Sequence, residues 1–254
     1  GMILDELNTK PMAAAFTKKD IKKLEDDTHY YGDFGRNYLS NSDIGSLLGN
    51  PKDFRKTKDA TVAMLQGRYF HTHLLEPQKL SEYDIVDCSS RNTKIYKEFG
   101  KQALLSKEID MLSQMAKSIR MNFVFYDMMY SPKNKFEQPI IKEIGGHLWK
   151  GKADIVAPDC LIDLKTTSSI EDFKYSARKY NYDSQAWLYG QFFGRPLKFI
   201  VVEKNSCKTG LFECSEDFLE YGRQKVFRAI EVYEKFFVAN APEDINQYFI
   251  NQTL

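Results

Sequence analysis

The sequence predicts an α/β fold in which a mixed central sheet is flanked by helices and preceded by a helical N-terminal elaboration. Residues 145–167 alternate like the two arms of a β-hairpin around a Pro158-Asp159 turn. The segments before and after this hairpin carry apolar residues at helical spacing. No linker rich in Pro, Gly or Ser divides the 254 residues. We therefore expect an N-terminal arm and charged helix over residues 1–38 and one domain over 39–254.

The composition excludes several classes of protein. The chain has 36 Lys and Arg against 35 Asp and Glu, so any phosphate-binding surface must be local. Neither a run of about 18 apolar residues nor a signal pattern is present, which predicts a cytoplasmic protein with no membrane contact. The cysteines lack C-x-x-C spacing and are expected to be free thiols: Cys88, Cys160, Cys207 and Cys214.

The part of the chain before the hairpin is predicted to be mainly helical. Its expected elements are a solvated helix over Asp20–Tyr30, a short helix capped by Asn41 or Ser42, a helix over Asp59–Glu76 capped by Asp59, a strand over Tyr83–Asp87, helices over Lys94–Leu105 and Lys107–Met129, and a strand over Phe136–Leu148. After the hairpin we expect helices over Ile170–Tyr180 and Asp183–Phe193, strands over Lys198–Lys204 and Gly210–Cys214, and a long helix over Phe218–Ala239.

A histidine on the third of these helices has two interpretations. Ala60, Ala63, Met64, Gly67, His71 and Leu74 recur at three- and four-residue steps along one face of Asp59–Glu76. A histidine on such a face is usually a packed core residue. Gly67, one turn earlier, would let a neighbouring backbone approach closely. The alternative is that His71 binds a metal ion.

The hairpin register places two acidic residues opposite each other. A two-residue Pro158-Asp159 connection pairs Ile155 with Ile162 and Asp154 with Asp163. Like charges at this cross-strand separation repel. Lys165 lies on the same face as Asp163 because side chains alternate. Such a pair suits Mg²⁺, which prefers carboxylates, water and phosphate oxygens, and this favours a phosphodiester substrate.

These residues resemble a known signature. Asp154, Asp163 and Lys165 have the D-x8-D-x-K form of the PD-(D/E)XK nucleases. The string from Gly67 through His71 to Leu75-Glu76-Pro77 resembles the corresponding motif of RecE-type (exonuclease VIII-like) nucleases. Asp163-Leu-Lys-Thr-Thr167 and the Gln185-x-x-x-Tyr189 pair resemble motifs that follow in the same order. The resemblance covers residues from about 39 to 193.

The resemblance implies a restriction-endonuclease-like core and a set of site residues. His71, Asp154, Asp163 and the backbone carbonyl of Leu164 would hold Mg²⁺ or Mn²⁺. Lys165 would position the attacking water or stabilise negative charge. Gln185 and Tyr189 would orient Lys165 or touch the DNA backbone. Glu143 is either a further metal ligand or a solvent-facing strand residue.

The resemblance also implies an exonuclease that degrades double-stranded DNA from free ends, in recombination or phage DNA processing. A homo-oligomer and a single-strand annealing protein are the partners it suggests. Two alternatives stay open: an endonuclease with the same metal site, and a DNA-binding recombination module without catalysis. The sequence does not locate the DNA track, although cations occur around Arg68, Arg178 and Lys179.

Overall fold

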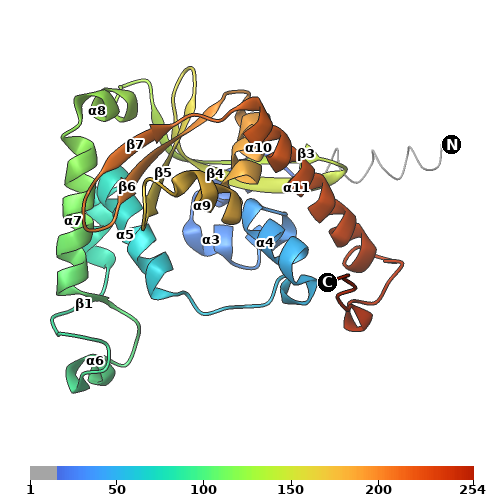
Figure 1. The fold of residues 1–254 in the computed structure, drawn as a ribbon, viewed down its shortest axis with the longest axis horizontal. Helices are drawn as coiled ribbons and strands as arrows, with labels where there is room; N and C mark the ends of the chain where they lie inside the picture. Colours follow the sequence, from blue (N-terminus) through green and yellow to red (C-terminus); the bar gives the residue numbers. More distant parts are fainter. Residues whose placement is uncertain (1–15) are drawn as a thin grey trace.

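The computed structural model of the protein describes residues 16–254, and its centre is a five-stranded sheet in the order β3-β4-β5-β6-β7 (Figure 1). The strands are β3 (Lys135–Ile144), β4 (His147–Val156), β5 (Leu161–Thr167), β6 (Leu197–Glu203) and β7 (Thr209–Phe212). Strands β5 and β6 pair in parallel, and the other three neighbouring pairs are antiparallel. The sheet is therefore mixed, as the sequence predicts.

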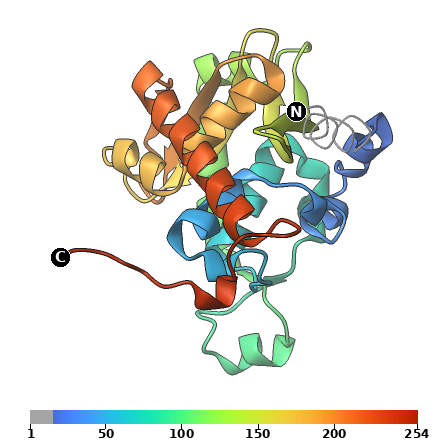
Figure 2. The same ribbon diagram turned by 90° about the vertical axis from the view of Figure 1, so that its right-hand side faces the viewer.

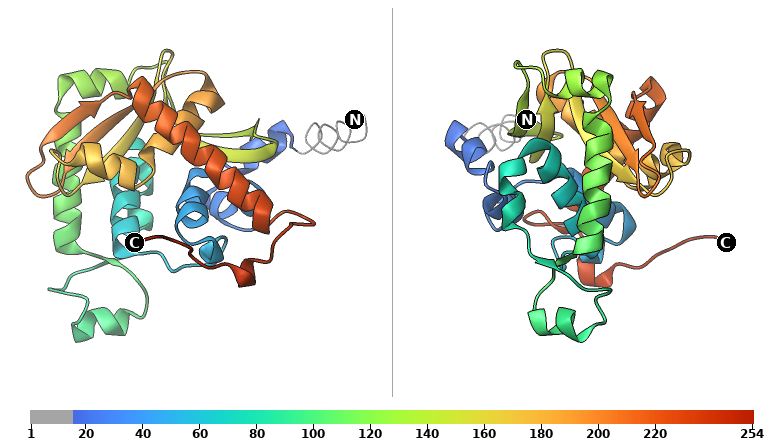
Figure 3. Two further views of the ribbon diagram at one scale, coloured as in Figure 1. Left: turned by 45° about the vertical axis from the view of Figure 1, so that its right-hand side comes forward. Right: turned by 90° about the vertical axis from the view of Figure 1, so that its left-hand side faces the viewer.

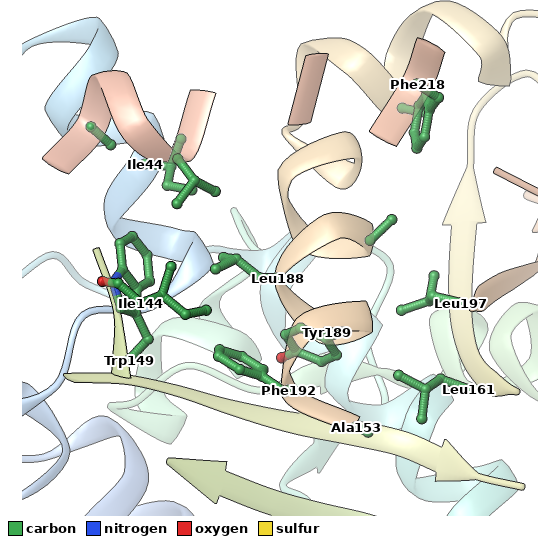
Figure 4. Close-up of a cluster of buried hydrophobic side chains, with 14 of the residues drawn as sticks. Ile44, Ile144, Trp149, Ala153, Leu161, Leu188, Tyr189, Phe192, Leu197 and Phe218 are labelled. Carbon is green, nitrogen blue, oxygen red and sulfur yellow. The ribbon is translucent and has the colours of Figure 1, made fainter. Parts of the chain in front are cut away.

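Helices cover both faces of this sheet (Figures 1 and 3). One face packs against α4 (Asn41–Gly49), α9 (Phe173–Lys179), α10 (Tyr182–Phe193) and α11 (Glu216–Phe236), and the other against α5 (Val62–Leu75), α7 (Ser106–Arg120) and α8 (Phe123–Met129). Figure 4 shows the first cluster, in which Tyr189 packs against Phe192, and Trp149 lies beside Ile144. Ala153 joins this cluster and Ile155 the second. Both faces of the hairpin formed by β4 and β5 are therefore packed.

The strand predicted over Phe136–Leu148 is two strands. The chain reverses at Gly145-Gly146, whose φ angles are 61° and 83°, and Ile144 pairs with His147. Two consecutive positive φ angles are what a tight turn between right-twisted strands requires, and glycine adopts them without steric cost. The Gly-Gly dipeptide was the signal for this turn.

The second hairpin follows the predicted register. Ile155 pairs with Ile162 and Val156 with Leu161, and the Ala157 amide donates to the Cys160 carbonyl at 2.9 Å. The regular pairing of β4 with β5 stops at Ile155 and Ile162. The two strands diverge beyond this point.

Several helix boundaries differ from the prediction. Helix α5 begins after Thr61, whose hydroxyl caps the Met64 amide, and not after Asp59. Ser40, with Asp43, forms the capping box of α4 in place of Asn41 or Ser42. In each case the residue that caps the helix has extended backbone angles and a side chain that reaches a free amide.

Two of the predicted helices are interrupted. The first, α6 (Lys94–Phe99), ends at Gly100, and Leu104–Leu105 forms β2, which pairs with β1 (Ile85–Val86). The second is broken between α7 and α8, where the Asn122 side chain accepts from the Phe125 amide at 3.1 Å. A cap residue inside an apolar pattern restarts the helix in a new direction.

The N-terminal segment packs on the sheet and is not a solvated helix. It forms two short helices, α2 (Lys18–Lys23) and α3 (Asp27–Tyr31), and Leu24 between them is fully buried in a cluster with Tyr30 and Ile141 of β3. Residues 1–15 lie outside the described residues, and the division into 1–38 and 39–254 stays a prediction.

The C-terminal tail leads away from the body of the protein (Figure 2). Four short 3-10 helices lie among the connecting segments of the described residues. They are η1 (Gly35–Asn37), η2 (Pro51–Asp53), η3 (Pro77–Glu82) and η4 (Ile245–Gln247). The four cysteines are free thiols, as predicted. Within residues 16–254, none of the helices has the length and apolar character needed to cross a bilayer.

Candidate active site

The candidate site forms where β4 and β5 diverge. Asp154 and Asp163 are the first residues beyond the last regular β4–β5 pair. The backbone groups that the two strands turn toward each other there are therefore free for other partners. Asp154 Oδ2 accepts a hydrogen bond from the Leu164 amide at 2.8 Å, which takes the place of a strand-to-strand bond. The amide and carbonyl of one strand residue point to the same side. The Leu164 carbonyl therefore lies on the edge of β5 that faces Asp154, where the metal prediction needs it.

His71 reaches this point from α5. Its Nδ1 donates to the Gly67 carbonyl at 2.9 Å, and its Nε2 lies 3.0 Å from Asp154 Oδ2. Burial acts to lower the pKa of His71, but the charge of Asp154 outweighs burial and raises the pKa to about 9. His71 and Asp154 therefore form an ion pair at neutral pH.

Two expectations about the surroundings of His71 are wrong. The packed residues of α5 are Tyr69, Phe70, Leu74 and Leu75, so His71 lies beside the packed face and not on it. A Cβ at Gly67 would meet no atom within 4 Å, so close backbone approach does not explain this glycine. What the turn supplies is the Gly67 carbonyl, which fixes the imidazole ring.

Asp163 is held from two sides. Lys165 Nζ lies 2.9 Å from Asp163 Oδ2, and Gln185 Nε2 donates to Asp163 Oδ1 at 2.9 Å. Burial raises the pKa of Asp163, whereas in Asp154 the charge of His71 outweighs burial and lowers the pKa. Burial acts to lower the pKa of Lys165, but the charge of Asp163 raises it, so the ammonium stays protonated.

Helix α10 presents three side chains to the site, at positions 182, 185 and 189. The Lys165 ammonium lies over the Tyr182 ring, 4.2 Å from its centre. The Tyr189 hydroxyl accepts from the Lys152 amide at 3.1 Å and so fixes β4 two residues before Asp154. The structure therefore brings Gln185 to Asp163 and Tyr189 to the β4 backbone, so neither contacts Lys165, which was one of the two predicted roles. The other predicted role, contact with the DNA backbone, stays a prediction. Tyr182, which the sequence analysis did not select, is the residue of α10 that contacts Lys165.

The glutamate that faces the site is Glu137, and not Glu143. The pairs Phe136–Ile155 and Gln138–Ala153 place Glu137 directly opposite Asp154, where its φ of 51° interrupts the regular pairing. Burial, and after it the charge of Asp154, raises the pKa of Glu137 to about 8.

Glu143 is exposed and pairs with Leu148 near the turn. It lies six residues farther along β3, about 20 Å from the level of Asp154 at the usual rise of a strand. The tentative assignment of Glu143 as a ligand is therefore wrong. Counting back from a Gly145-Gly146 turn would have selected Glu137.

The donor set fits a hard divalent cation. Carboxylate and carbonyl oxygens are the ligands that Mg²⁺ and Mn²⁺ prefer. Asp163 Oδ2 is buried and receives no well-directed hydrogen bond from residues 16–254, although Lys165 lies close to it. In the same part of the chain, no three His, Cys, Asp or Glu side chains are grouped tightly enough to hold an ion alone. The Leu164 carbonyl and water would complete the set.

An acidic pair on diverging strands of a mixed sheet, with a lysine two residues after the second acid, defines a PD-(D/E)XK-type protein. The comparison with protein families agrees: the profile described as "PDDEXK-like domain of unknown function (DUF3799)" matches residues 48–243, and the chain belongs to this family. The predicted superfamily, fold class and nuclease class are confirmed at this level.

Among solved structures, a candidate exonuclease from Eubacterium rectale is 18% identical, with a TM-score of 0.62 over 82% of this chain and 85% of that chain. At this identity the likeness shows a shared fold. An alkaline exonuclease from Laribacter hongkongensis is 12% identical, with a TM-score of 0.37 over 77% of this chain and 88% of that chain. Among curated proteins, none matches the chain.

Proposed function

We propose that this protein is a Mg²⁺- or Mn²⁺-dependent deoxyribonuclease that hydrolyses DNA phosphodiester bonds as an exonuclease on double-stranded ends. The observation that carries the proposal is the convergence of His71, Asp154, Asp163 and Lys165 from α5, β4 and β5. The exonuclease part rests on the resemblance to RecE-type motifs and agrees with the name of the Eubacterium rectale protein.

In the proposed mechanism, Asp154, Asp163, the Leu164 carbonyl and His71, through an unprotonated Nε2, would hold the ion, which would supply Lewis-acid chemistry at the scissile phosphate and a more acidic water. Gln185 keeps Asp163 in place through its amide, so the carboxylate cannot rotate away. The protonated Lys165 offsets negative charge that develops on the phosphate. Tyr189 fixes the strand that carries Asp154.

Neither alternative from the sequence has a structural observation in its favour. A module without catalysis would have no need of two buried carboxylates, a lysine and a histidine at one point. An endonuclease would use the same residues and differ only in substrate. The homo-oligomer and the single-strand annealing partner remain predictions.

The decisive experiment compares linear with covalently closed duplex DNA, both followed by staining after electrophoresis, in the presence of Mg²⁺ and, separately, of a chelator. We expect degradation of the linear duplex that depends on the metal. Closed circular DNA should survive. Cleavage of both substrates would favour the endonuclease, and cleavage in the chelator would contradict the metal-dependent mechanism.

A further inference from the structure

A basic hollow lies beside the candidate site, between α3, the start of α4 and β4. Its volume is about 320 Å³, and its lining includes five cationic residues against two carboxylates. The cations are Arg36, Arg55, Lys56, Lys58 and Lys150. We call this feature the basic hollow. It was not visible in the sequence, because its cations come from separate segments and the net charge is near zero.

Strand β4 carries residues of both the hollow and the candidate site. Lys150 and Lys152 point to the same side of the strand because its residues alternate, and both lie against Tyr30 of α3. Asp154, two residues farther along, meets His71. Four residues of strand separate Lys150 from Asp154, which is about 13 Å. One strand of duplex DNA carries a phosphate about every 3.4 Å of helix axis, so this distance spans about four phosphates.

The cations of the hollow are largely without carboxylate partners. Within residues 16–254, Arg55 forms an ion pair with Asp43 at 3.4 Å, and the other four cations have none. Lys150 is 6% exposed and donates to the Tyr30 carbonyl, a neutral group. Burial and the charge of Arg55 lower the pKa of Lys150 to about 8. An anion entering the hollow would relieve this crowding of like charge.

Neutral donors complete the lining. Ser40 and Ser42 lie at the start of α4, with their hydroxyl oxygens 2.9 Å apart. Tyr31 lines the hollow, and the site is close enough for its charges to act on this residue. Burial, and after it the charges of Asp27, Glu137 and Asp154, raise the pKa of the Tyr31 hydroxyl to about 12. Its hydroxyl therefore stays protonated at neutral pH and can donate to a phosphate oxygen.

A larger cavity on the other side of α3 has the opposite charge. This acidic cleft has a volume of about 660 Å³, and seven carboxylates and three cations line it. It also reaches the site, through Glu137 and Lys152. Size alone would select the acidic cleft as the path of the substrate, but DNA phosphates are repelled by such a lining.

We propose that the basic hollow binds backbone phosphates of the substrate DNA strand, which runs from Asp154 past Tyr31 to the hollow. The acidic cleft stays free of DNA. The proposal deepens the nuclease function proposed above, because it locates the track that leads to the same site. Terminal and internal phosphates are both anions with oxygen acceptors, so the lining of the hollow suits either, and the test below distinguishes them.

The test is a binding titration in which no cleavage takes place. A fluorescent duplex with a 5′-phosphate, and the same duplex with a 5′-hydroxyl, are titrated in EDTA over a series of NaCl concentrations. The test variant is Arg36→Gln/Lys58→Gln, which changes two exposed side chains of the hollow. The matched control is Lys94→Gln/Lys97→Gln on α6, which removes the same charge outside both cavities. Circular dichroism checks that each variant is folded.

We expect the hollow variant to lose affinity by roughly 10- to 60-fold near 0.1 M salt, and the salt slope of log K to fall by about 2. The control should lose less than about twofold. Equal loss on both duplexes identifies internal phosphates, and loss confined to the 5′-phosphorylated duplex identifies a terminal phosphate. Unchanged affinity and slope in the hollow variant would overturn the proposal.

Binding without cleavage separates this proposal from the nuclease function. If the wild-type protein cleaves no DNA with Mg²⁺ but the hollow variant still loses affinity, the nuclease proposal is wrong and DNA binding by the hollow is supported. If the wild-type protein cleaves DNA and the hollow variant binds normally, DNA binding by the hollow is wrong and the nuclease proposal is supported.

Discussion

The two ends of one stretch of β4 hold charge in opposite ways. At Asp154 the carboxylate has partners within the chain, the His71 ring and the Leu164 amide, and the neighbouring Asp163 is paired with Lys165 and Gln185. Lys150 instead lies near another cation, Arg55, and its ammonium donates to a neutral group, the Tyr30 carbonyl. The residues around Asp154 hold one another in a fixed arrangement, whereas the cations around Lys150 have positive charge that an external anion could neutralise. Chemistry and substrate binding should therefore be separable by mutation.

The sharpest way to test this separation is to remove the acidic end. Asp163→Ala and Lys165→Ala should each lower the cleavage rate about 1,000-fold or more, because charge stabilisation at the reacting phosphate is lost. DNA affinity in EDTA should change little. The rates are measured on labelled duplex with Mg²⁺, beside the binding titration. Cleavage unchanged in both variants would refute the catalytic assignment.

The next effect concerns the metal. Glu137→Gln should raise the Mg²⁺ concentration needed for half-maximal cleavage by about 10- to 100-fold, since Glu137 lies opposite Asp154 and groups around a metal site contribute on that scale. The matched control is Glu143→Gln, which alters an exposed residue of the same strand. If the control needs as much Mg²⁺ as the variant, Glu137 has no special part in the site.

Changes at the basic end should act on substrate capture. Steady-state cleavage by Arg36→Gln/Lys58→Gln should show KM raised about tenfold or more and kcat within about twofold of wild type, because phosphate contacts remote from the reaction bind ground and transition states alike. A fall in kcat at saturating DNA would show instead that the hollow takes part in the chemical step, and the two ends would not be separable.

A smaller effect is expected at Tyr182, under the Lys165 ammonium. Tyr182→Leu should lower kcat by about 2- to 30-fold, the range that a cation–π contact of about 0.5–2 kcal/mol allows. Tyr182→Phe keeps the ring and should restore most of the rate. If Phe and Leu are equally impaired, the hydroxyl and not the ring positions Lys165.

The smallest effect should follow from the acidic cleft. Glu82→Gln/Asp84→Asn removes two of its charges and should leave DNA affinity within about twofold of wild type, or slightly tighter, since the track does not enter the cleft. The measurement is the same titration in EDTA. A marked loss of affinity would place DNA in the cleft and reverse the comparison.

The register that brings Asp154 level with Asp163 could be predicted, because a two-residue turn fixes which residues of the two strands face each other. That the strands diverge one residue before this point could not be predicted from the local pattern. The positions of His71, Lys165 and Gln185 came from a resemblance in motif order. The element types were mostly predicted, while the Gly145-Gly146 turn and the break at Asn122 were missed, although each carries a local signal. Missing that turn led directly to Glu143 in place of Glu137.

The sequence by itself determined the acidic pair, the lysine beside it and the α/β order of elements, because these follow from alternation and short turns. Only the tertiary structure decided where β4 leaves β5, that Tyr182 lies under Lys165, and that cations from η1, from the segment after η2 and from β4 meet in one hollow. Contacts between distant segments depend on how helices pack on a twisted sheet, and no local pattern encodes that packing.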